Sequence, residues 1–292
     1  MNVLSLFDGM SCGQIALERL GIKVDKYYAS EIDEPALMVS KKNYPNTIYV
    51  GDVAKIKADD LEPIDLLIGG SPCQGFSFNG KQLAFDDERS VLFFEFVRLL
   101  KEYKPKYFLL ENVNMKKEYE DVINKFLGCR PIKINSKIVS AQSRPRLYWT
   151  NIPLIGELAD KNILLKDVLE TDKPKEYFDV FKAQDRKIKS IENKKWSAEK
   201  LNDINGKCQC LTAGFGMGGS KPWIYCDYID YIRMLTPVEC ERLQNVPDDY
   251  TKCDGITNRK RYKMLGNGWT IDVITHLLSG MNKRNNLTRF LK

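Results

Sequence analysis

Residues 64–77 read Ile-Asp-Leu-Leu-Ile-Gly-Gly-Ser-Pro-Cys-Gln-Gly-Phe-Ser, and this stretch decides the expected fold. Its apolar first part is typical of a buried strand, which stops at two glycines before a loop that carries Cys73. Open α/β sheets place reacting groups on loops at the carboxyl ends of strands, so Cys73 is a candidate nucleophile. A turn with a small buried cysteine is the alternative, and for an isolated Pro-Cys pair it is the better interpretation.

The first 150 residues alternate between strand-like and helix-like segments. Apolar stretches predict strands at 3–7, 26–30, 48–50, 64–68, 107–110, 132–139 and 146–150. Helical spacing predicts helices at 14–20, 34–43, 90–102 and 117–127, and Ser90 is expected to cap the third. This alternation is typical of an α/β fold with a doubly wound, mainly parallel sheet.

The pattern changes near Pro153, after which the chain is polar and rich in turns as far as about residue 230. We therefore expect a sheet domain at 1–152, a second, smaller domain at 153–255, and a segment at 256–292 that returns to the first domain. In the later part, Thr236 and Glu239 predict a capping box at the start of a helix. The run Gly266-Asn267-Gly268 is expected to lead into a last helix at 269–278.

Composition narrows the class of protein. The chain of 292 residues is 43% hydrophobic and 29% charged, has no apolar run near the ~20 residues that a membrane span needs, and begins without signal-peptide features. We expect a protein of the cytoplasm with reduced cysteines and no membrane partner. The eight cysteines form no Cys-x-x-Cys pair and His276 is the single histidine, so no metal site is expected. The same shortage disfavours activation of a cysteine by histidine.

The net charge of +6 is unevenly distributed. Residues 182–207 carry +4 and residues 255–292 carry +7, whereas the remainder carries −5. Such concentration indicates a surface that binds a polyanion, with solvated helix faces as the alternative.

Acidic or reactive residues follow consecutive predicted strands. They are Asp8, Glu31, Asp52, Cys73 and Glu111, which a doubly wound sheet brings to one crevice. Glu31 is placed to accept hydrogen bonds from ribose hydroxyls, and Asp52 to accept one from the exocyclic amine of adenine. Because the turn at 8–13 is not Gly-x-Gly-x-x-Gly, an adenosyl sulfonium donor competes well with NAD as the ligand.

Six motifs, taken together, resemble the DNA (cytosine-5)-methyltransferase family from residue 2 to about 280. In chain order they are Ser71-Pro72-Cys73-Gln74-Gly75-Phe76-Ser77 through Gly80-Lys81-Gln82, Glu111-Asn112-Val113, Gln142-Ser143-Arg144-Pro145-Arg146, Leu211-Thr212-Ala213, Arg233-Met234-Leu235-Thr236-Pro237-Val238-Glu239-Cys240 and Gly266-Asn267-Gly268. The chain looks like the bacterial or phage type, with some resemblance to the catalytic domain of animal de novo DNA methyltransferases. The resemblance implies a Rossmann-like fold dependent on S-adenosylmethionine, with a smaller target-recognition domain.

The resemblance also implies roles for residues. Cys73 would attack C6 of a cytosine flipped out of double-stranded DNA, and Glu111, protonated or sharing a proton with N3, would meet the charge that builds on the ring. Arg146 would hold O2, and Arg144 would support Cys73 and a nearby phosphate. Residues that would bind S-adenosylmethionine are Phe7, Gly9, Glu31, Asp52, Pro72, Leu92 and Asn267. Residues that would contact DNA are Ser77, Lys81 and Arg89.

The chain departs from the commoner family pattern at several positions. Ser11-Cys12 replaces a Gly-Gly pair, Ile32 a Trp, Gly268-Trp269 a Ser-Val pair, and Cys210 a Thr. An RNA cytosine-5 methyltransferase on the same fold is the alternative enzyme, although the Cys-Phe-Thr run of the relative that acts on tRNA is not evident here. A catalytically silent DNA-binding protein is less favoured, since it would need neither Cys73 nor Glu111. A cognate restriction endonuclease is a possible partner of such an enzyme. The sequence favours no particular oligomeric state.

Overall fold

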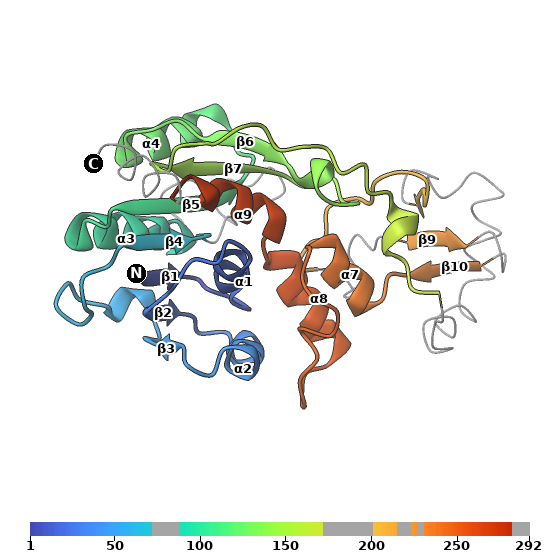
Figure 1. Ribbon diagram of the computed structural model, residues 1–292, viewed down its shortest axis with the longest axis horizontal. Coiled ribbons are helices and arrows are strands. Elements are labelled where there is room, and N and C mark those ends of the chain that lie inside the picture. The colour runs from blue at the N-terminus through green and yellow to red at the C-terminus, as the bar shows by residue number, and fades with distance from the viewer. Residues whose placement is uncertain (72–87, 172–200, 215–222, 227–230, 282–292) are drawn as a thin grey trace, which may run out of the picture. The chain divides into compact units, whose positions relative to one another are not determined.

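The computed structural model describes residues 1–71, 88–171, 201–214, 223–226 and 231–281 (Figure 1). Its contacts divide the chain into two compact units. Unit 1 comprises Met1–Asn135, Pro145–Leu158 and Ile271–Lys292, and unit 2 comprises Ser136–Arg144 and Ala159–Thr270. The domain limits at 152/153 and 255/256 remain predictions from the sequence.

Unit 1 is built around a seven-stranded sheet with the order β3-β2-β1-β4-β5-β7-β6. The strands are β1 (Asn2–Leu6), β2 (Lys26–Ser30), β3 (Ile48–Tyr49), β4 (Leu66–Gly69), β5 (Tyr107–Val113), β6 (Ile132–Asn135) and β7 (Pro145–Thr150). The first five pair in parallel, whereas β7 runs antiparallel to both β5 and β6. The predicted doubly wound α/β fold is confirmed, and the strand order reverses between β1 and β4, where such sheets bind ligands.

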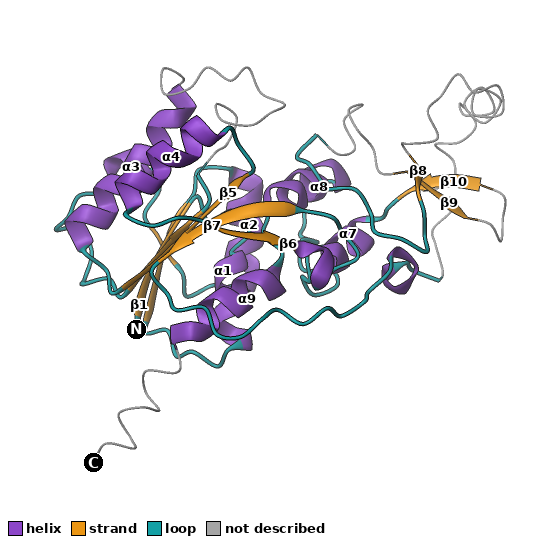
Figure 2. Ribbon diagram, turned by 90° about the horizontal axis from the view of Figure 1, so that it is seen from above, coloured by secondary structure: helices purple, strands orange, loops and turns teal. Residues whose placement is uncertain are grey.

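Helices cover both faces of this sheet. They are α1 (Cys12–Arg19), α2 (Glu34–Asn43), α3 (Glu88–Tyr103), α4 (Lys117–Leu127) and α9 (Ile271–Leu278), which continues into a short 3₁₀ helix, Ser279–Met281. Figure 2 shows α3 and α4 on one face and α1 and α9 on the other. Another 3₁₀ turn, η1 (Val53–Lys55), follows β3.

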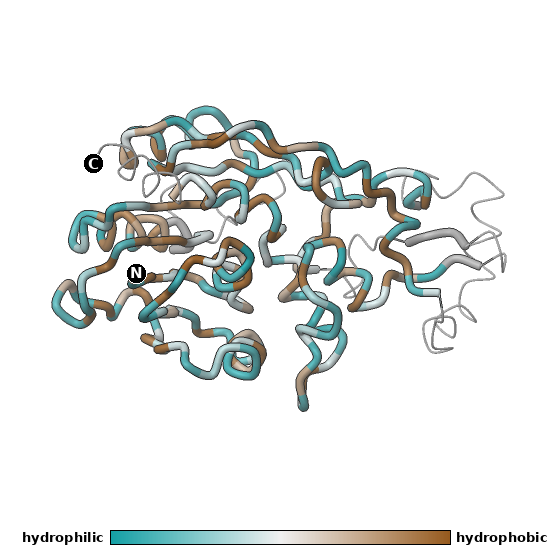
Figure 3. Tube along the Cα trace, viewed as in Figure 1, coloured by the Kyte–Doolittle hydropathy of each residue, from teal (hydrophilic) through white to brown (hydrophobic). Residues whose placement is uncertain are grey.

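The core of unit 1 lies between the central strands and the helices α3 and α4. β4 is buried along its whole length and β5 in all but its last residue, as expected for strands covered on both faces. Phe93 and Phe96 of α3 and Ile123 of α4 are fully buried against them. Each such side chain contributes about 1.5–3 kcal/mol on burial. Figure 3 shows the corresponding hydrophobic stretches along the chain.

Unit 2 contains short elements and a three-stranded sheet of order β10-β9-β8. Its elements are η3 (Ser136–Ile138), η4 (Leu165–Val168), β8 (Leu201–Asn202), β9 (Trp223–Cys226), β10 (Tyr231–Met234), α7 (Pro237–Leu243) and α8 (Asn258–Asn267). The capping box predicted for α7 is confirmed, because Thr236 and Glu239 satisfy each other's backbone N–H groups. Glu239 also forms a fully buried ion pair with Arg233, at 2.6 Å.

Several element limits differ from the predictions. α3 begins at Glu88, so Ser90 lies inside the helix rather than at its cap. β5 continues to Val113, because antiparallel β7 pairs with it that far, and Glu111 therefore lies within the strand. The strand predicted to reach 139 ends at Asn135. The run Gly266-Asn267-Gly268 closes α8, which ends at Asn267, and the last helix begins at Ile271 rather than at 269.

The position of Gly266 in α8 yields a stability prediction. A Cβ at Gly266 would lie 2.2 Å from the carbonyl carbon of Thr212 and 2.3 Å from its oxygen. Alanine is normally better than glycine in a helix by about 1 kcal/mol. We nevertheless expect Gly266→Ala to lower the free energy of unfolding by about 1–3 kcal/mol in urea denaturation, because backbone on both sides must move.

Gly206→Ala is the matched control in unit 2, since its Cβ would meet nothing closer than 3.5 Å. Equal stability of the two variants would contradict the close packing of α8 on residues 212–213.

Candidate active site

The turn after β1 has an unusual backbone. Phe7, Gly9 and Ser11 all adopt left-handed conformations, with φ of 56°, 58° and 62°. Such conformations are costly for residues other than glycine and cluster at binding sites. A Cβ built on Gly9 would have nothing within 4 Å, so another molecule can approach this backbone closely. The turn therefore leaves space beside Gly9, and the predicted contact of Gly9 with a cofactor stays a prediction.

Ser11 is the residue that replaces the first glycine of the family's usual pair. Its hydroxyl donates a hydrogen bond to the Asp8 carboxylate and lies 2.6 Å from Oγ of Ser40, which in turn lies 2.7 Å from the hydroxyl of Tyr49. The bond from Ser11 to Asp8 is local, whereas the contact with Ser40 ties the turn to α2. Together they hold the left-handed backbone at Ser11, in the way that short polar residues tolerate this region. The left-handed φ also explains why glycine suits this position.

Asp8 lies at the centre of this buried network. Its side chain is 8% exposed, and Tyr27 donates a hydrogen bond to its Oδ1 over 2.8 Å. Burial raises the pKa of Asp8 to about 6, although the hydrogen bonds from Ser11 and Tyr27 oppose the shift. Asp8 thus holds the turn together and does not face the crevice as a free acid, a role that its position after a strand did not reveal.

Glu31 follows β2 and is fixed by backbone groups. Its Oε2 accepts a hydrogen bond from Gly9 N, and its Oε1 accepts from Ile32 N and Asp33 N, each over 2.7 Å. Because a carboxylate offers about four acceptor positions, one position remains beyond these three bonds. The predicted ribose-binding acid is therefore oriented beside the turn at Gly9.

Asp52 follows β3 and caps η1, where its Oδ1 accepts a hydrogen bond from Ala54 N over 3.0 Å. Phe7 and Leu92 are partly buried and pack against the core of unit 1. Their predicted contacts with a cofactor stay predictions. Phe7, Gly9, Glu31 and Asp52 all follow the carboxyl ends of β1, β2 and β3, so one edge of the sheet carries them.

Glu111 and Arg146 form an ion pair across two strands. Glu111 of β5 is opposite Tyr148 of β7, and Arg146 is opposite Val113, so Glu111 and Arg146 are diagonal neighbours on the same face of the sheet. Arg146 Nε lies 2.9 Å from Glu111 Oε1, and each side chain is 12% exposed. The pair combines the rigid donor fork of the guanidinium with a carboxylate on the neighbouring strand.

Asn112 is a residue of the site that carried no predicted role of its own. Its Nδ2 lies 3.2 Å from Oγ and 3.4 Å from the carbonyl oxygen of Ser71, and both residues are buried. Asn112 thereby fixes the last described residue before the loop that carries Cys73. Pro72, Cys73, Ser77 and Lys81, and the side chain of Arg89, lie outside the described residues.

Arg144 and Asn267 belong to unit 2. Arg144 is 3% exposed and donates hydrogen bonds to the carbonyl oxygens of Leu211 (2.8 Å), Gly266 (2.9 Å) and Gly268 (2.9 Å). It therefore ties the backbone on both sides of Asn267 to the segment at 211. The predicted support of Cys73 by Arg144 stays a prediction.

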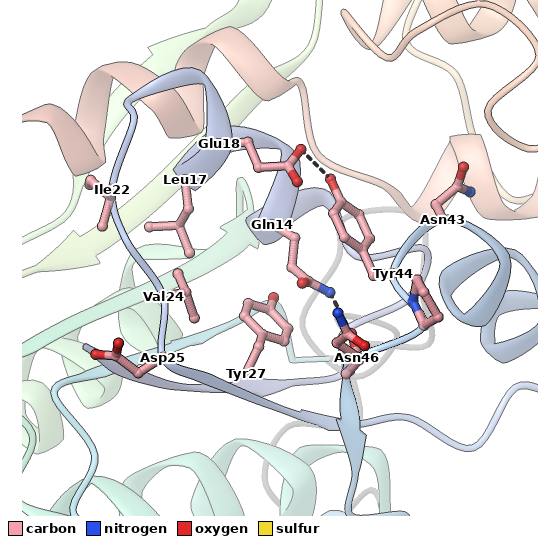
Figure 4. Close-up of a pocket in the computed structure, with 12 residues that line it drawn as sticks. Gln14, Leu17, Glu18, Ile22, Val24, Asp25, Tyr27, Asn43, Tyr44 and Asn46 are labelled. Carbon is pink, nitrogen blue, oxygen red and sulfur yellow. Dashed lines mark hydrogen bonds between the residues drawn. The ribbon is translucent and has the colours of Figure 1, made fainter.

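A cavity of about 430 Å³ lies in unit 1, between α1, the start of β2 and residues 43–47. Figure 4 shows the side chains that line it. None of the predicted cofactor residues lines it. Tyr44 donates a hydrogen bond to Glu18 across it, and Tyr27 of its wall bonds to Asp8. Among the residues described, no group of side chains could hold a metal ion, and no helix is both long and apolar enough to cross a membrane.

Comparison with known proteins defines the class and then the family. The fold is shared with a methyltransferase: the crystal structure of S. pombe Dnmt2 methyltransferase matches with a TM-score of 0.76 at 20% identity, over 98% of this chain and 99% of that one. The family profile described as C-5 cytosine-specific DNA methylase matches residues 1–211 and 172–283. The chain belongs to this family, whose members use S-adenosylmethionine as methyl donor.

Curated relatives agree with this assignment. The chain is 34% identical over 207 residues to Type II methyltransferase M.NgoBV of Neisseria gonorrhoeae, which covers 60% of this chain and 48% of that protein. It is 27% identical over 315 residues to Type II methyltransferase M.Bsp6I of Bacillus sp. (strain RFL6), with 97% and 99% covered. The chain thus spans about half the length of the first relative.

The buried carboxyl of Asp8 predicts a pH dependence of stability. Its pKa is about 6 in the folded protein against the ordinary 3.8, so the folded state keeps the proton to higher pH. The contribution of Asp8 is therefore full below pH 3.8 and is lost as the pH rises through 6. Between these values we expect wild type to lose roughly 2–3 kcal/mol relative to Asp8→Asn, measured by urea denaturation.

Asp59→Asn is the control, because Asp59 is exposed, and it should follow the wild-type curve. A constant difference between wild type and Asp8→Asn from about pH 4 to 7 would contradict the raised pKa of Asp8.

Proposed function

We propose that this protein transfers a methyl group from S-adenosylmethionine to C5 of a cytosine flipped out of double-stranded DNA at a specific short sequence. The observation that carries the proposal is the Glu111–Arg146 pair, held at 2.9 Å on two neighbouring strands of a chain that belongs to the C-5 cytosine-specific DNA methylase family. The cytosine ring presents two hydrogen-bond acceptors, N3 and O2, side by side on one edge. A carboxyl group and a guanidinium side by side match that edge.

The residues of unit 1 fit an adenosyl methyl donor. Glu31 is a carboxylate fixed by three backbone N–H groups, Gly9 leaves its Cβ direction open, and Asp52 is held at the start of η1. These groups suit ribose hydroxyls and an adenine amine, with Phe7 beside them for the ring. When bound, S-adenosylmethionine supplies an electrophilic methyl group. We assign its binding to Phe7, Gly9, Glu31, Asp52, Pro72, Leu92 and Asn267.

Cys73 is the proposed nucleophile. Its thiolate forms a bond to C6 of the cytosine, and the electron pair of the C5–C6 double bond moves into the ring. Glu111, which must be protonated or share a proton with N3 when the base is bound, provides that proton at N3, and Arg146 provides a hydrogen bond at O2, so that the negative charge is neutralised as it develops. C5 then bonds to the methyl carbon as the bond from that carbon to the sulfonium sulfur breaks, which leaves the donor as a neutral thioether. N3 returns its proton to Glu111, the C5 proton passes to water, and the electron pair of the C5–H bond re-forms the C5–C6 double bond as the C6–S bond breaks, which restores the aromatic ring and the thiolate.

The remaining residues are proposed to position the reacting groups. Arg144 orders the segment around Asn267 through its three carbonyl contacts, in addition to the predicted support of Cys73. Ser77, Lys81 and Arg89 would contact phosphates, and unit 2 would contribute to target recognition. The Type II methyltransferase name of the relatives supports a place in a restriction–modification system, with a cognate endonuclease as partner and the cytoplasm as location.

The direct test uses labelled S-adenosylmethionine and unmethylated genomic duplex DNA. We expect the label to be transferred to the DNA. Bisulfite sequencing of the product should place the new 5-methylcytosine within one short sequence. Cys73→Ser should lower the rate by at least about 10³-fold, because the covalent step is lost. Cys253→Ser, at a partly exposed free cysteine, should keep the wild-type rate.

Transfer RNA in place of duplex DNA separates this function from the alternative. Label on the RNA and none on duplex DNA would favour an RNA cytosine-5 methyltransferase. Label on neither would overturn the proposal as a whole.

A further inference from the structure

Arg98 in the middle of α3 uses all five of its N–H donors. Its Nε donates to Glu95 over 2.9 Å. Its Nη1 donates to the carbonyl oxygen of Ile56 and to Glu102, both over 2.9 Å, and its Nη2 donates to the carbonyl oxygen of Val53 over 3.2 Å and to Glu95 over 2.6 Å. A guanidinium offers five donors in a rigid fork, so this geometry fixes its position completely.

The two carbonyl groups belong to the segment that Asp52 begins. Asp52 caps η1, whose first residue is Val53, and Ile56 directly follows this turn. The side chains of Val53 and Ile56 are both buried in the core of unit 1. One turn further along α3, the hydroxyl of Tyr103 donates to the carbonyl oxygen of Lys57 over 2.6 Å. α3 therefore holds residues 53–57 by hydrogen bonds as well as by packing.

This segment needs support from outside the sheet. β3 is an edge strand of two residues that pairs with β2 through Tyr28–Ile48 and Ala29–Tyr49. Glu31, by contrast, follows a five-residue strand with neighbours on both sides. After these two pairs, Val50 N donates to the carbonyl oxygen of Ala29 over 2.9 Å and Ser30 Oγ donates to that of Gly51 over 2.7 Å, so β2 holds the chain as far as Gly51. Asp52 begins the segment beyond that point, and its direction also depends on what holds η1.

Glu95 and Glu102, the acidic neighbours of Arg98, orient its guanidinium. Glu95 and Glu102 lie at i−3 and i+4 on the same helix face, where such pairs contribute little to stability by themselves. Their carboxylates accept hydrogen bonds from the N–H groups of Arg98 that do not donate to the carbonyl oxygens of Val53 and Ile56. The guanidinium is thus held in the one orientation that reaches both carbonyl oxygens.

We propose that Arg98 is a positioning residue for adenine recognition: by holding η1 through the carbonyl groups of Val53 and Ile56, it fixes the carboxylate of Asp52 toward the exocyclic amine. The inference rests on the proposed function, since it concerns the same cofactor site. Arg98 itself touches neither cofactor nor substrate. Loss of Arg98 should weaken the preference for adenine over other bases in the cofactor more than it weakens binding of the ribose and amino-acid parts.

The test measures binding without DNA or turnover. Isothermal titration calorimetry compares S-adenosylhomocysteine with S-inosylhomocysteine, in which a 6-oxo group replaces the 6-amino group. Wild type should prefer the adenosyl ligand by at least about tenfold, because the oxo group cannot donate to Asp52. Arg98→Met should weaken the adenosyl ligand about tenfold and leave the inosyl ligand nearly unchanged.

Two further variants make the result specific. Arg98→Lys keeps the charge and can reach one carbonyl oxygen, so it should retain part of the preference. Lys101→Met, at an exposed position of the same helix, should match wild type. In the Asp52→Asn background, Arg98→Met should have no further effect on the preference, because both changes act through one group.

Two outcomes would overturn the role of Arg98 while cofactor binding by wild type stands. One is that Arg98→Met and Arg98→Lys each lose affinity equally for the two ligands. The other is that neither variant loses affinity for the adenosyl ligand. Failure of wild type to bind either ligand would overturn the proposed function itself, and the positioning role with it.

Discussion

The antiparallel pairing of β7 with β5 is the constraint on which the proposed chemistry depends. In a purely parallel sheet the first residues of a strand lie at the amino edge, away from the crevice. Because β7 runs the other way, Arg146 near its start lies opposite Val113 at the end of β5. The reversal therefore brings an arginine to the side of the sheet where the strand-end acids lie, one diagonal step from Glu111. The 2.9 Å ion pair follows from this register.

The parallel strands β1, β2 and β3 supply the other half of the site in unit 1. Their carboxyl ends carry a turn with left-handed residues, a carboxylate fixed by three N–H groups and a carboxylate that caps a short helix. Each is stabilised by a contact behind it: Ser11 through Asp8, Glu31 through Gly9, and Asp52 through the segment that Arg98 holds. The energetic cost of the left-handed residues in the turn is thus offset by buried hydrogen bonds.

Much of this arrangement could be predicted from the sequence, because it depends on local pattern. The apolar strands, the cap at Thr236 and the positions of Glu31 and Asp52 after strands follow from short stretches of residues. The end of β5 could not, since it is set by β7, a partner strand far along the chain, and this placed Glu111 inside the strand. The burial of Asp8 and the role of Arg98 depend likewise on segments brought together by folding. An arginine with glutamates at i−3 and i+4 is typical of any solvated helix, so no local pattern distinguishes Arg98.

The central claim is that the Glu111–Arg146 pair prepares a cytosine for attack by Cys73. The most direct measurement uses duplex DNA in which 5-fluorocytosine replaces cytosine, because fluorine cannot leave C5 as a proton and the C6–S bond then persists. With methyl donor present, wild type should give a denaturation-resistant adduct that maps to Cys73. Glu111→Gln should form it at least about 10²-fold more slowly, and Glu118→Gln, at an exposed position of α4, at the wild-type rate. Recovery of free protein alone, or equal rates for wild type and Glu111→Gln, would contradict the claim.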